Sequence, residues 1–169
     1  MSRVIEFDLS KAGIDRAIEE LKEFRNGFLR KCGEVILYLA DMGRTQARFN
    51  IIAAGRIDTG LLANSIQALY NPSTRTGIVY TDVYYAIFVE YGTGIVGNYI
   101  DHPEAGKIGW VYDHNGHGVS GWNYYNWREG QWMNTAGQPA TAFMWNAKMA
   151  LRNIAPGYYK QIFDGWDGK

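Results

Sequence analysis

The sequence predicts an α+β fold in which a long N-terminal helix or helix pair and a C-terminal helix pack on a small antiparallel sheet. Apolar residues recur every three or four positions from residue 10 to about residue 50, and again after Pro139, which is the period of an α-helix. Between these segments, two β-prone runs flank a turn-rich linker. The 169 residues are 47 % hydrophobic and 20 % charged, which is enough for one domain with a core. We therefore predict a single domain over residues 1–169.

The first helix is expected to begin after Ser10, whose hydroxyl can accept a hydrogen bond from a backbone N–H of the first turn. Leu9 and Ile14 stand at the positions of a hydrophobic staple. A glycine inside a helix costs about 1 kcal/mol relative to alanine, so we expect a break or kink near Gly27.

The middle of the chain predicts a capped helical turn followed by a β-hairpin. Asp58 or Thr59 would cap the turn by accepting a hydrogen bond from a free backbone N–H. Residues 66–70 and 77–80 would form the two strands, because the linker 71–76 is rich in turn-forming residues.

Two further helices are expected. Thr81 or Asp82 would cap a short amphipathic helix that ends at the glycines after Tyr91. The C-terminal helix would follow Pro139 and end or kink at Pro156, because proline lacks the backbone N–H that a helix interior uses.

Residues 95–137 predict an inserted loop or hairpin rather than a second domain. Ten of the 20 glycines lie between residues 92 and 137, where the apolar side chains are mostly aromatic. Residues 107–112 and 119–125 are expected to pair as the hairpin. Its aromatic side chains would contact a partner protein, stack on sugars or single-stranded bases, or form a small satellite core. The candidate interface residues are Trp110, Trp122, Tyr124, Tyr125, Trp127 and Trp132.

Composition excludes several classes of function. Lys+Arg and Asp+Glu both number 17, so nothing favours binding driven by phosphate neutralisation or a coat on an anionic membrane. Cys32 is the single cysteine, so an intrachain disulfide or a zinc site of several thiolates is impossible. No apolar run approaches the ~20 residues of a membrane span, so we expect a soluble protein without a membrane partner.

Two patterns resemble catalytic or metal sites. Asp58-Thr59-Gly60 is the tripeptide of aspartic proteases, which need two carboxylates that share a proton; the long helical segment before it favours the helix-capping role. His102, His114 and His117, with nearby carboxylates, could hold zinc or nickel, but no helix fixes their separation. We therefore predict no catalytic, cofactor-binding or metal-binding residue, and a protein that is not an enzyme.

Three segments in order carry a resemblance to a known family. They are residues 58–66 (DTGLLANSI), 85–94 (YAIFVEYGTG) and 138–147 (QPATAFMWNA). Together they are similar to the motifs of the tail-component family of long-tailed phages and prophages, also described as the head–tail joining or tail-completion family. The motif positions that match are Asp58, Thr59, Gly60, Glu90, Tyr91, Gly92, Thr93, Pro139 and Phe143. The chain departs from the family in its longer aromatic insertion and in Ala142, where a proline is common.

The resemblance implies a structural virion protein of the head–tail junction, assembled in the host cytoplasm. It would form a ring, commonly a hexamer, between the head–tail connector and the tail terminator or tube proteins, and DNA would pass through without sequence recognition. Such a ring needs head-to-tail contacts that close by rotation, and a neutral chain suits a conduit for DNA. The alternatives are a tail terminator or minor tail protein, and a glycan-binding module built on the tryptophans of the insertion.

Overall fold

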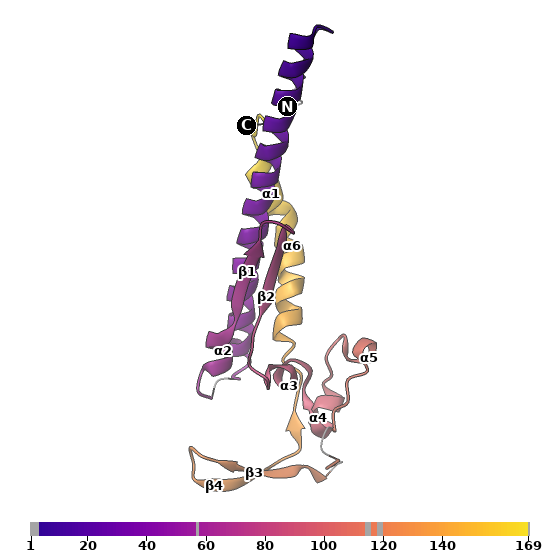
Figure 1. The fold of residues 1–169 in the computed structure, drawn as a ribbon. Coiled ribbons are helices and arrows are strands. Elements are labelled where there is room, and N and C mark those ends of the chain that lie inside the picture. The colour runs from indigo at the N-terminus through magenta and orange to yellow at the C-terminus, as the bar shows by residue number, and fades with distance from the viewer. Residues whose placement is uncertain (1–3, 57, 114–115, 118–119, 169) are drawn as a thin grey trace.

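The computed structural model describes residues 4–56, 58–113, 116–117 and 120–168, and it confirms the predicted α+β class. Two long helices, α1 (Lys11–Ala53) and α6 (Phe143–Phe163), lie side by side along the length of the molecule (Figure 1). Two separate antiparallel hairpins accompany them: β1 (Gln67–Asn71) with β2 (Thr76–Tyr80), and β3 (Trp122–Asn126) with β4 (Gln131–Thr135). The connecting elements are α2 (Leu61–Ser65), α3 (Ala86–Tyr91), α4 (Gly94–Tyr99), α5 (Ala105–Ile108) and β5 (Gly137–Gln138).

Helix α1 is continuous, so the predicted break near Gly27 is wrong. Its first turn is capped as predicted, because the Ser10 hydroxyl accepts a hydrogen bond from the Gly13 N–H at 3.1 Å. The turn that contains Gly27 is held by packing, with the Phe28 ring 5.5 Å from that of Phe163 in α6. Such tertiary contacts offset the unfavourable helix propensity of glycine. Leu9 is exposed, so the predicted staple does not bury it.

The first hairpin confirms the prediction, with Gln67 opposite Tyr80 and Asn71 opposite Thr76. The Asn71 side chain accepts hydrogen bonds from two backbone N–H groups of the turn. The hairpin packs on α1 through Gly77, where an added Cβ would lie 3.0 Å from a methyl group of Ile36.

The helix caps around this hairpin differ in detail from the prediction. The hydroxyl of Thr59 accepts from the Leu61 N–H at 3.2 Å, so the threonine supports the start of α2. The Thr81 hydroxyl accepts a hydrogen bond from the Val83 N–H, and the resulting turn lies just before α3. Helix α3 itself has no side-chain cap at its start, so the prediction that Thr81 or Asp82 caps it is wrong.

The core lies where the lower ends of α1 and α6 meet α2 and α3. Phe143 and Ile51 are completely buried there, among aliphatic side chains of all four helices. Helix α6 does not end at Pro156, because the turns beyond it also pack on α1. The Tyr158 ring stacks on that of Tyr38 with centroids 3.7 Å apart.

The second hairpin uses other residues than predicted, so the pairing of 107–112 with 119–125 is wrong. Trp122 lies opposite Thr135 and Asn126 opposite Gln131, and Lys107 belongs to α5. The side chain of Asn126 sets the turn, because its oxygen accepts from the N–H groups of Arg128 and Glu129. Residues 114–115 and 118–119 of the predicted hairpin lie outside the described residues.

Phe143→Ala is expected to destabilise the protein by about 3–5 kcal/mol, because it opens a cavity in the core. Phe49→Ala, at a phenylalanine that is 60 % exposed on α1, is the matched control and should change the free energy of unfolding by about 0.5 kcal/mol or less. Urea unfolding followed by circular dichroism measures both. Equal losses in the two variants would contradict this location of the core.

Candidate functional site

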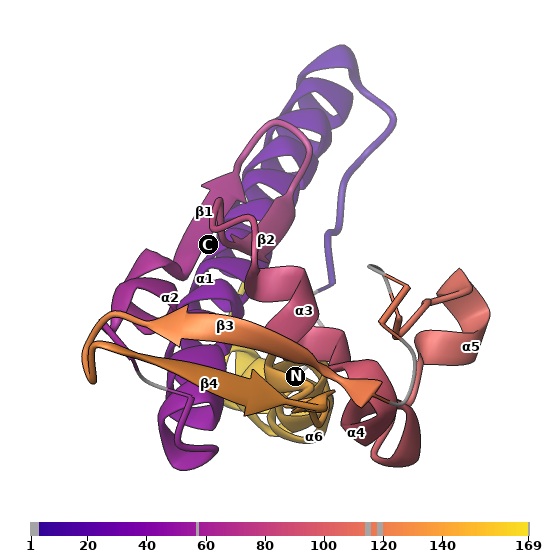
Figure 2. The ribbon, with the colours of Figure 1, turned by 90° about the horizontal axis from the view of Figure 1, so that it is seen from below.

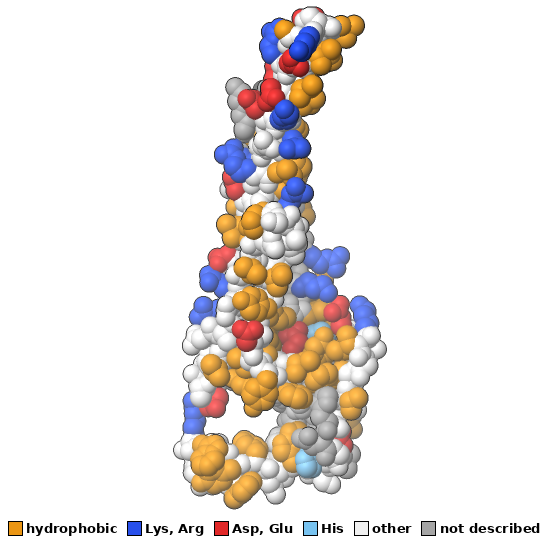
Figure 3. Space-filling model, in the orientation of Figure 1, with side chains coloured by type: hydrophobic (Ala, Val, Ile, Leu, Met, Phe, Trp, Pro, Cys, Tyr) orange, Lys and Arg blue, Asp and Glu red, His pale blue; other side chains and the backbone are white. Residues whose placement is uncertain are grey.

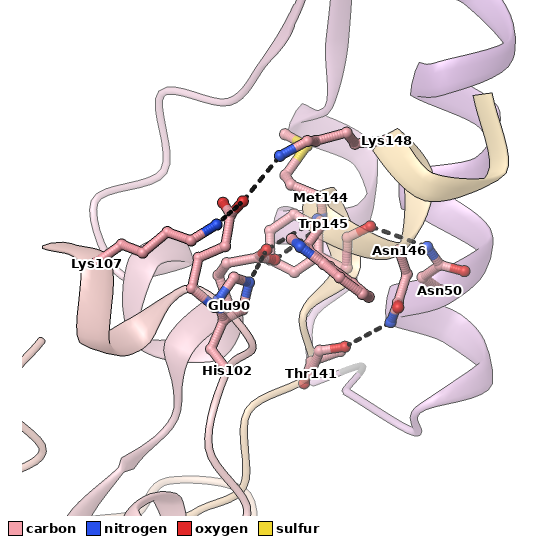
Figure 4. A network of polar contacts seen from close by, with 11 residues as sticks. Asn50, Glu90, His102, Lys107, Thr141, Met144, Trp145, Asn146 and Lys148 are labelled. Atoms are coloured by element: carbon pink, nitrogen blue, oxygen red, sulfur yellow. Dashed lines mark hydrogen bonds and ion pairs between the residues drawn. The ribbon is translucent and has the colours of Figure 1, made fainter. Parts of the chain in front are cut away.

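The site is a junction at which Glu90 of α3 caps the first turn of α6. Its two carboxylate oxygens accept hydrogen bonds from the N–H groups of Met144, at 2.9 Å, and Trp145, at 3.0 Å (Figure 4). The first amides of a helix have no partner inside the helix, and a negative charge there interacts favourably with the helix dipole. Helix α6 has no side-chain cap of its own. Glu90 therefore does, from a distant position in the sequence, what an N-cap residue usually does.

His102 holds the Glu90 carboxylate from the other side. Its Nε2 lies 3.0 Å from Oε1 of Glu90, and its Nδ1 accepts a hydrogen bond from the Glu104 N–H at 3.0 Å. Since Nδ1 is an acceptor, Nε2 carries the proton and donates to the carboxylate. Glu90 and His102 are both buried, and the Tyr91 ring lies against the imidazole at 4.2 Å. Burial, with the nearby carboxylate of Glu90, raises the pKa of the Tyr91 phenol.

The three histidines considered as a metal site do not meet. His102 is hydrogen-bonded to Glu90, while the His117 ring stacks on that of Trp122 with centroids 5.7 Å apart. His114 lies outside the described residues. Within the described part of the chain, no group of three or more histidine, cysteine, aspartate or glutamate side chains is arranged so that it could hold a metal ion.

A second carboxylate connects the insertion to α6 at the surface. Lys148 Nζ lies 3.0 Å from Oε1 of Glu104, and Lys107 lies 3.5 Å from the same oxygen. The hydrogen bond from Lys148 holds the pKa of the Glu104 carboxyl below its usual value. Glu90 and His102 lie between this surface pair and the core, in the wall of a cavity of about 480 Å³. In Figure 3 acidic and histidine atoms are seen within a hydrophobic rim at this level of the molecule.

The insertion begins at the Gly-Thr-Gly segment, residues 92–94, and its end returns to pair with this segment. Thr93 bridges antiparallel to Gln138, and Gly94 to Gly137. Gly92 has a φ of +80°, and an added Cβ would lie 2.7 Å from the backbone nitrogen of Ala140, so only glycine fits. The Gly92-Thr93-Gly94 segment thus closes the base of the insertion, and Pro139 follows directly after the returning strand.

Ala142 stands where the motif that this chain resembles commonly has a proline. It precedes α6 with a φ of +49°, in the left-handed region. Proline is restricted to a φ near −65°, so it could not adopt this conformation. The backbone therefore enters α6 in a conformation that a proline at residue 142 could not adopt.

The β3–β4 hairpin reaches back across the lower end of the molecule to the Asp58 loop (Figure 2). Nε of Arg128 lies 2.8 Å from Oδ1 of Asp58, and the same guanidinium donates to the Asp58 carbonyl. Both side chains are mostly exposed. This contact connects the hairpin to the body of the molecule, and Figure 3 shows the open space between the two. A cavity of about 520 Å³ in this region is lined by Arg56, Leu61 and Gln138, among others.

The six candidate interface aromatics divide into two groups. Trp110 donates its indole N–H to the Gly92 carbonyl at 3.1 Å, and Trp122 is partly buried, so these two residues support the insertion. Trp127 and Trp132 are 87 % and 71 % exposed, and both contact the ring of Tyr125 edge-on. Tyr124 is also exposed. The hairpin therefore carries the aromatic surface that is free to meet a partner.

Two pairings were missed by sequence reasoning. The sequence indicated Glu90 only as a residue of the resembled motif, and no local sequence pattern indicates its contact with His102. Arg128 and Asp58 are 70 positions apart, and neither lies in a pattern that would connect them.

Comparison with protein-family models, curated proteins and solved structures finds no match to this chain. Among the described residues, no helix combines the length and the hydropathy needed to cross a membrane.

Glu90→Gln is expected to destabilise the protein by about 1.5–3 kcal/mol, because the buried acceptor loses its charge and one of its two acceptor oxygens. Glu129→Gln, at an exposed glutamate, serves as the control and should leave the free energy of unfolding nearly unchanged. Urea unfolding provides the measurement. A loss no larger than that of the control would show that Glu90 does not hold α6.

Lys148→Met is expected to raise the pKa of the Glu104 carboxyl toward its usual value, because the hydrogen bond that lowers it is lost. Since the pKa of Glu104 is depressed in the folded protein, its contribution to stability is present at neutral pH and disappears as the pH falls through that pKa. NMR titration of the Glu104 side-chain carbonyl measures the shift. An unchanged titration in the variant would mean that Lys148 is not the partner in solution.

Asp58→Asn is expected to loosen the β3–β4 hairpin with little loss of global stability, because exposed ion pairs contribute about 0–1 kcal/mol. Amide hydrogen exchange in residues 122–135 should become faster, and added salt should have the same effect on the wild type. Asp41→Asn, in an exposed pair within α1, is the control. Identical exchange in wild type and Asp58→Asn would show that the ion pair of Asp58 with Arg128 does not restrain the hairpin.

Proposed function

We propose that this chain is a structural virion protein of the head–tail junction of a tailed phage, a neck or tail-completion protein. It assembles with copies of itself into a ring, a hexamer by analogy with other tail rings, which joins the connector to the tail and lets DNA pass. Its action depends on complementary surfaces and involves no bond-making chemistry.

The observation that carries this proposal is the exposure of large apolar side chains at both ends of the molecule. Ile14, Ile18 and Leu21 are exposed on the first turns of α1, and Trp127 and Trp132 on the β3–β4 hairpin. These two elements lie at opposite ends of the molecule (Figure 1). Exposed apolar patches of this kind mark surfaces that other proteins cover. A subunit with contact surfaces at its two ends suits an assembly that has a neighbour on each side.

The positions of the motif residues add support. Glu90 and Phe143 lie at the junction of α3 with α6, and Gly92 and Thr93 close the insertion. These are structural roles, as expected in a family defined by its fold. Thr59 and Gly60 similarly begin α2 rather than a catalytic loop.

Immunogold labelling of phage particles that carry the gene tests the proposal. Label is expected at the neck, and particles made without the protein should accumulate as separate heads and tails. Label on free tails as well as joined ones would favour the tail-terminator alternative, and label along or at the tip of the tail would favour a minor tail protein.

The exposed indoles of Trp127 and Trp132 keep the glycan-binding alternative testable. Binding of a sugar to a stacked indole changes tryptophan fluorescence. Titration with representative sugars is expected to leave the fluorescence unchanged. A saturable change that Trp132→Ala abolishes would favour a glycan-binding module instead.

A further inference from the structure

The cavity of about 520 Å³ beside the Asp58 loop has in its wall a guanidinium that the fold leaves unpaired. The Nε of Arg56 is shielded from solvent, yet it has no hydrogen-bond partner among the described residues. Arg56 comes shortly after the end of α1, where the helix dipole favours a cation, but the dipole gives Nε no acceptor. A shielded N–H without an acceptor costs free energy, which an acceptor from outside the chain would recover.

Asp58, which is two positions from Arg56, is already paired with another cation. Its Oδ1 lies 2.8 Å from Nε of Arg128, and the same guanidinium donates to the Asp58 carbonyl. Figure 2 shows the β3–β4 hairpin reaching the connection between α1 and α2. Among the described residues that line the cavity, Arg56 and Asp58 carry the charges. The hairpin therefore neutralises the acid of this wall and leaves its cation without a counter-charge.

The opposite chemistry is found in the rest of the cavity wall. Leu62, Tyr85 and Val89 line the cavity, and we call them its apolar side. Leu62 is a buried core residue, and the other two pack against the core, so the apolar side is firmly supported. Thr59 adds a hydroxyl donor, since its oxygen accepts from the Leu61 N–H and its hydrogen remains available. The volume lies within the range of about 300–1,000 Å³ that is usual for small-molecule sites.

We propose that this cavity binds a carboxylate joined to an apolar or aromatic group, with the carboxylate on Arg56 and the carbon group against the apolar side. The N–H groups of a guanidinium match the two oxygens of a carboxylate, and such charge-assisted hydrogen bonds are strong. One negative charge balances the unpaired cation, whereas a dianion such as phosphate would place excess negative charge beside Asp58. A free small molecule and the C-terminus of a partner chain share this chemistry. The inference goes beyond the proposed function and does not depend on it.

Titration of the full chain with phenylpropionate, followed by heteronuclear NMR of the arginine side chains, tests the site directly. The Nε–H signal of Arg56 is expected to move and to saturate, because this group gains the acceptor that the chain does not supply. Phenylpropanol replaces the carboxylate with a hydroxyl, and acetate keeps the charge without the aromatic group. Each should bind at least about tenfold more weakly, since each retains only one half of the interaction.

Two variants of Arg56 and one matched control assign the binding to its guanidinium. Arg56→Met should weaken phenylpropionate binding at least about tenfold, because the charge and all the donors are lost. Arg56→Lys should weaken it severalfold, because the ammonium keeps the charge but lacks the planar pair of donors. Arg152→Met, at an exposed arginine of α6, is the control and should bind as the wild type does. Circular dichroism checks that each variant is folded.

A second pair of variants tests whether Arg128 keeps the site open. Arg128→Gln releases the Asp58 carboxylate, which then competes with the ligand for Arg56, so the affinity for phenylpropionate should fall severalfold. Combining Arg128→Gln with Asp58→Asn removes the competitor and should restore the affinity of the wild type. Equal affinity of Arg128→Gln and the wild type, or a double variant as weak as Arg128→Gln, would overturn this role of Arg128.

A short peptide that ends in phenylalanine, with its C-terminal carboxylate free or amidated, distinguishes the two sources of the ligand. Tighter binding of the free peptide than of phenylpropionate, lost on amidation, would identify a partner's chain end; binding of phenylpropionate alone would identify a small molecule. Three outcomes would overturn the inference: an Arg56 Nε–H signal that moves with neither probe, equal affinities of Arg56→Met and Arg152→Met, or phenylpropanol bound as tightly as phenylpropionate. None of these measurements needs a phage particle, so they are independent of the neck assignment.

Discussion

The hydrogen bonds from the first turn of α6 to the Glu90 carboxylate connect the distant parts of this molecule. They bring α3 against the start of the C-terminal helix, and they place His102, from the insertion, on the same carboxylate. A buried carboxylate is stable only when its oxygens are paired, and here three donors pair it. The segment before the insertion, the insertion itself and the segment after it therefore share one buried charge.

Around this junction the molecule has regions of different character. Beside it lies the core, in which Ile51 and Phe143 are completely buried. Beyond it, the β3–β4 hairpin is held at its tip by an exposed pair of Arg128 and Asp58. At the far end, the first turns of α1 are covered on one side only, where Asp8 of the preceding segment packs against Gly13. Firm packing in the centre thus supports two extremities that have few contacts, a distribution that leaves surface available for neighbours.

Much of the fold follows from local sequence signals, and the differences have identifiable causes. The helical period, the Ser10 cap and the turn at Asn71 were sufficient for α1, α6 and the first hairpin. Continuity at Gly27 and through Pro156 was not predictable, because ring packing between α1 and α6 overrides local propensity there. The true strands of the insertion were hidden in a run of aromatic, asparagine and glycine residues that has no clear period. The capping of α6 by Glu90 could not be inferred either, since the partners are 54 and 55 positions apart and meet only after folding.

The bridges of Thr93 to Gln138 and Gly94 to Gly137 bring the two ends of the insertion to neighbouring positions. A segment that departs and rejoins at one point behaves as a cassette, whose length can change while the chain on either side keeps its course. A shorter or longer segment between these two bridges would leave the paired helices α1 and α6 unchanged. The same geometry makes this position a natural place to graft a foreign peptide for display.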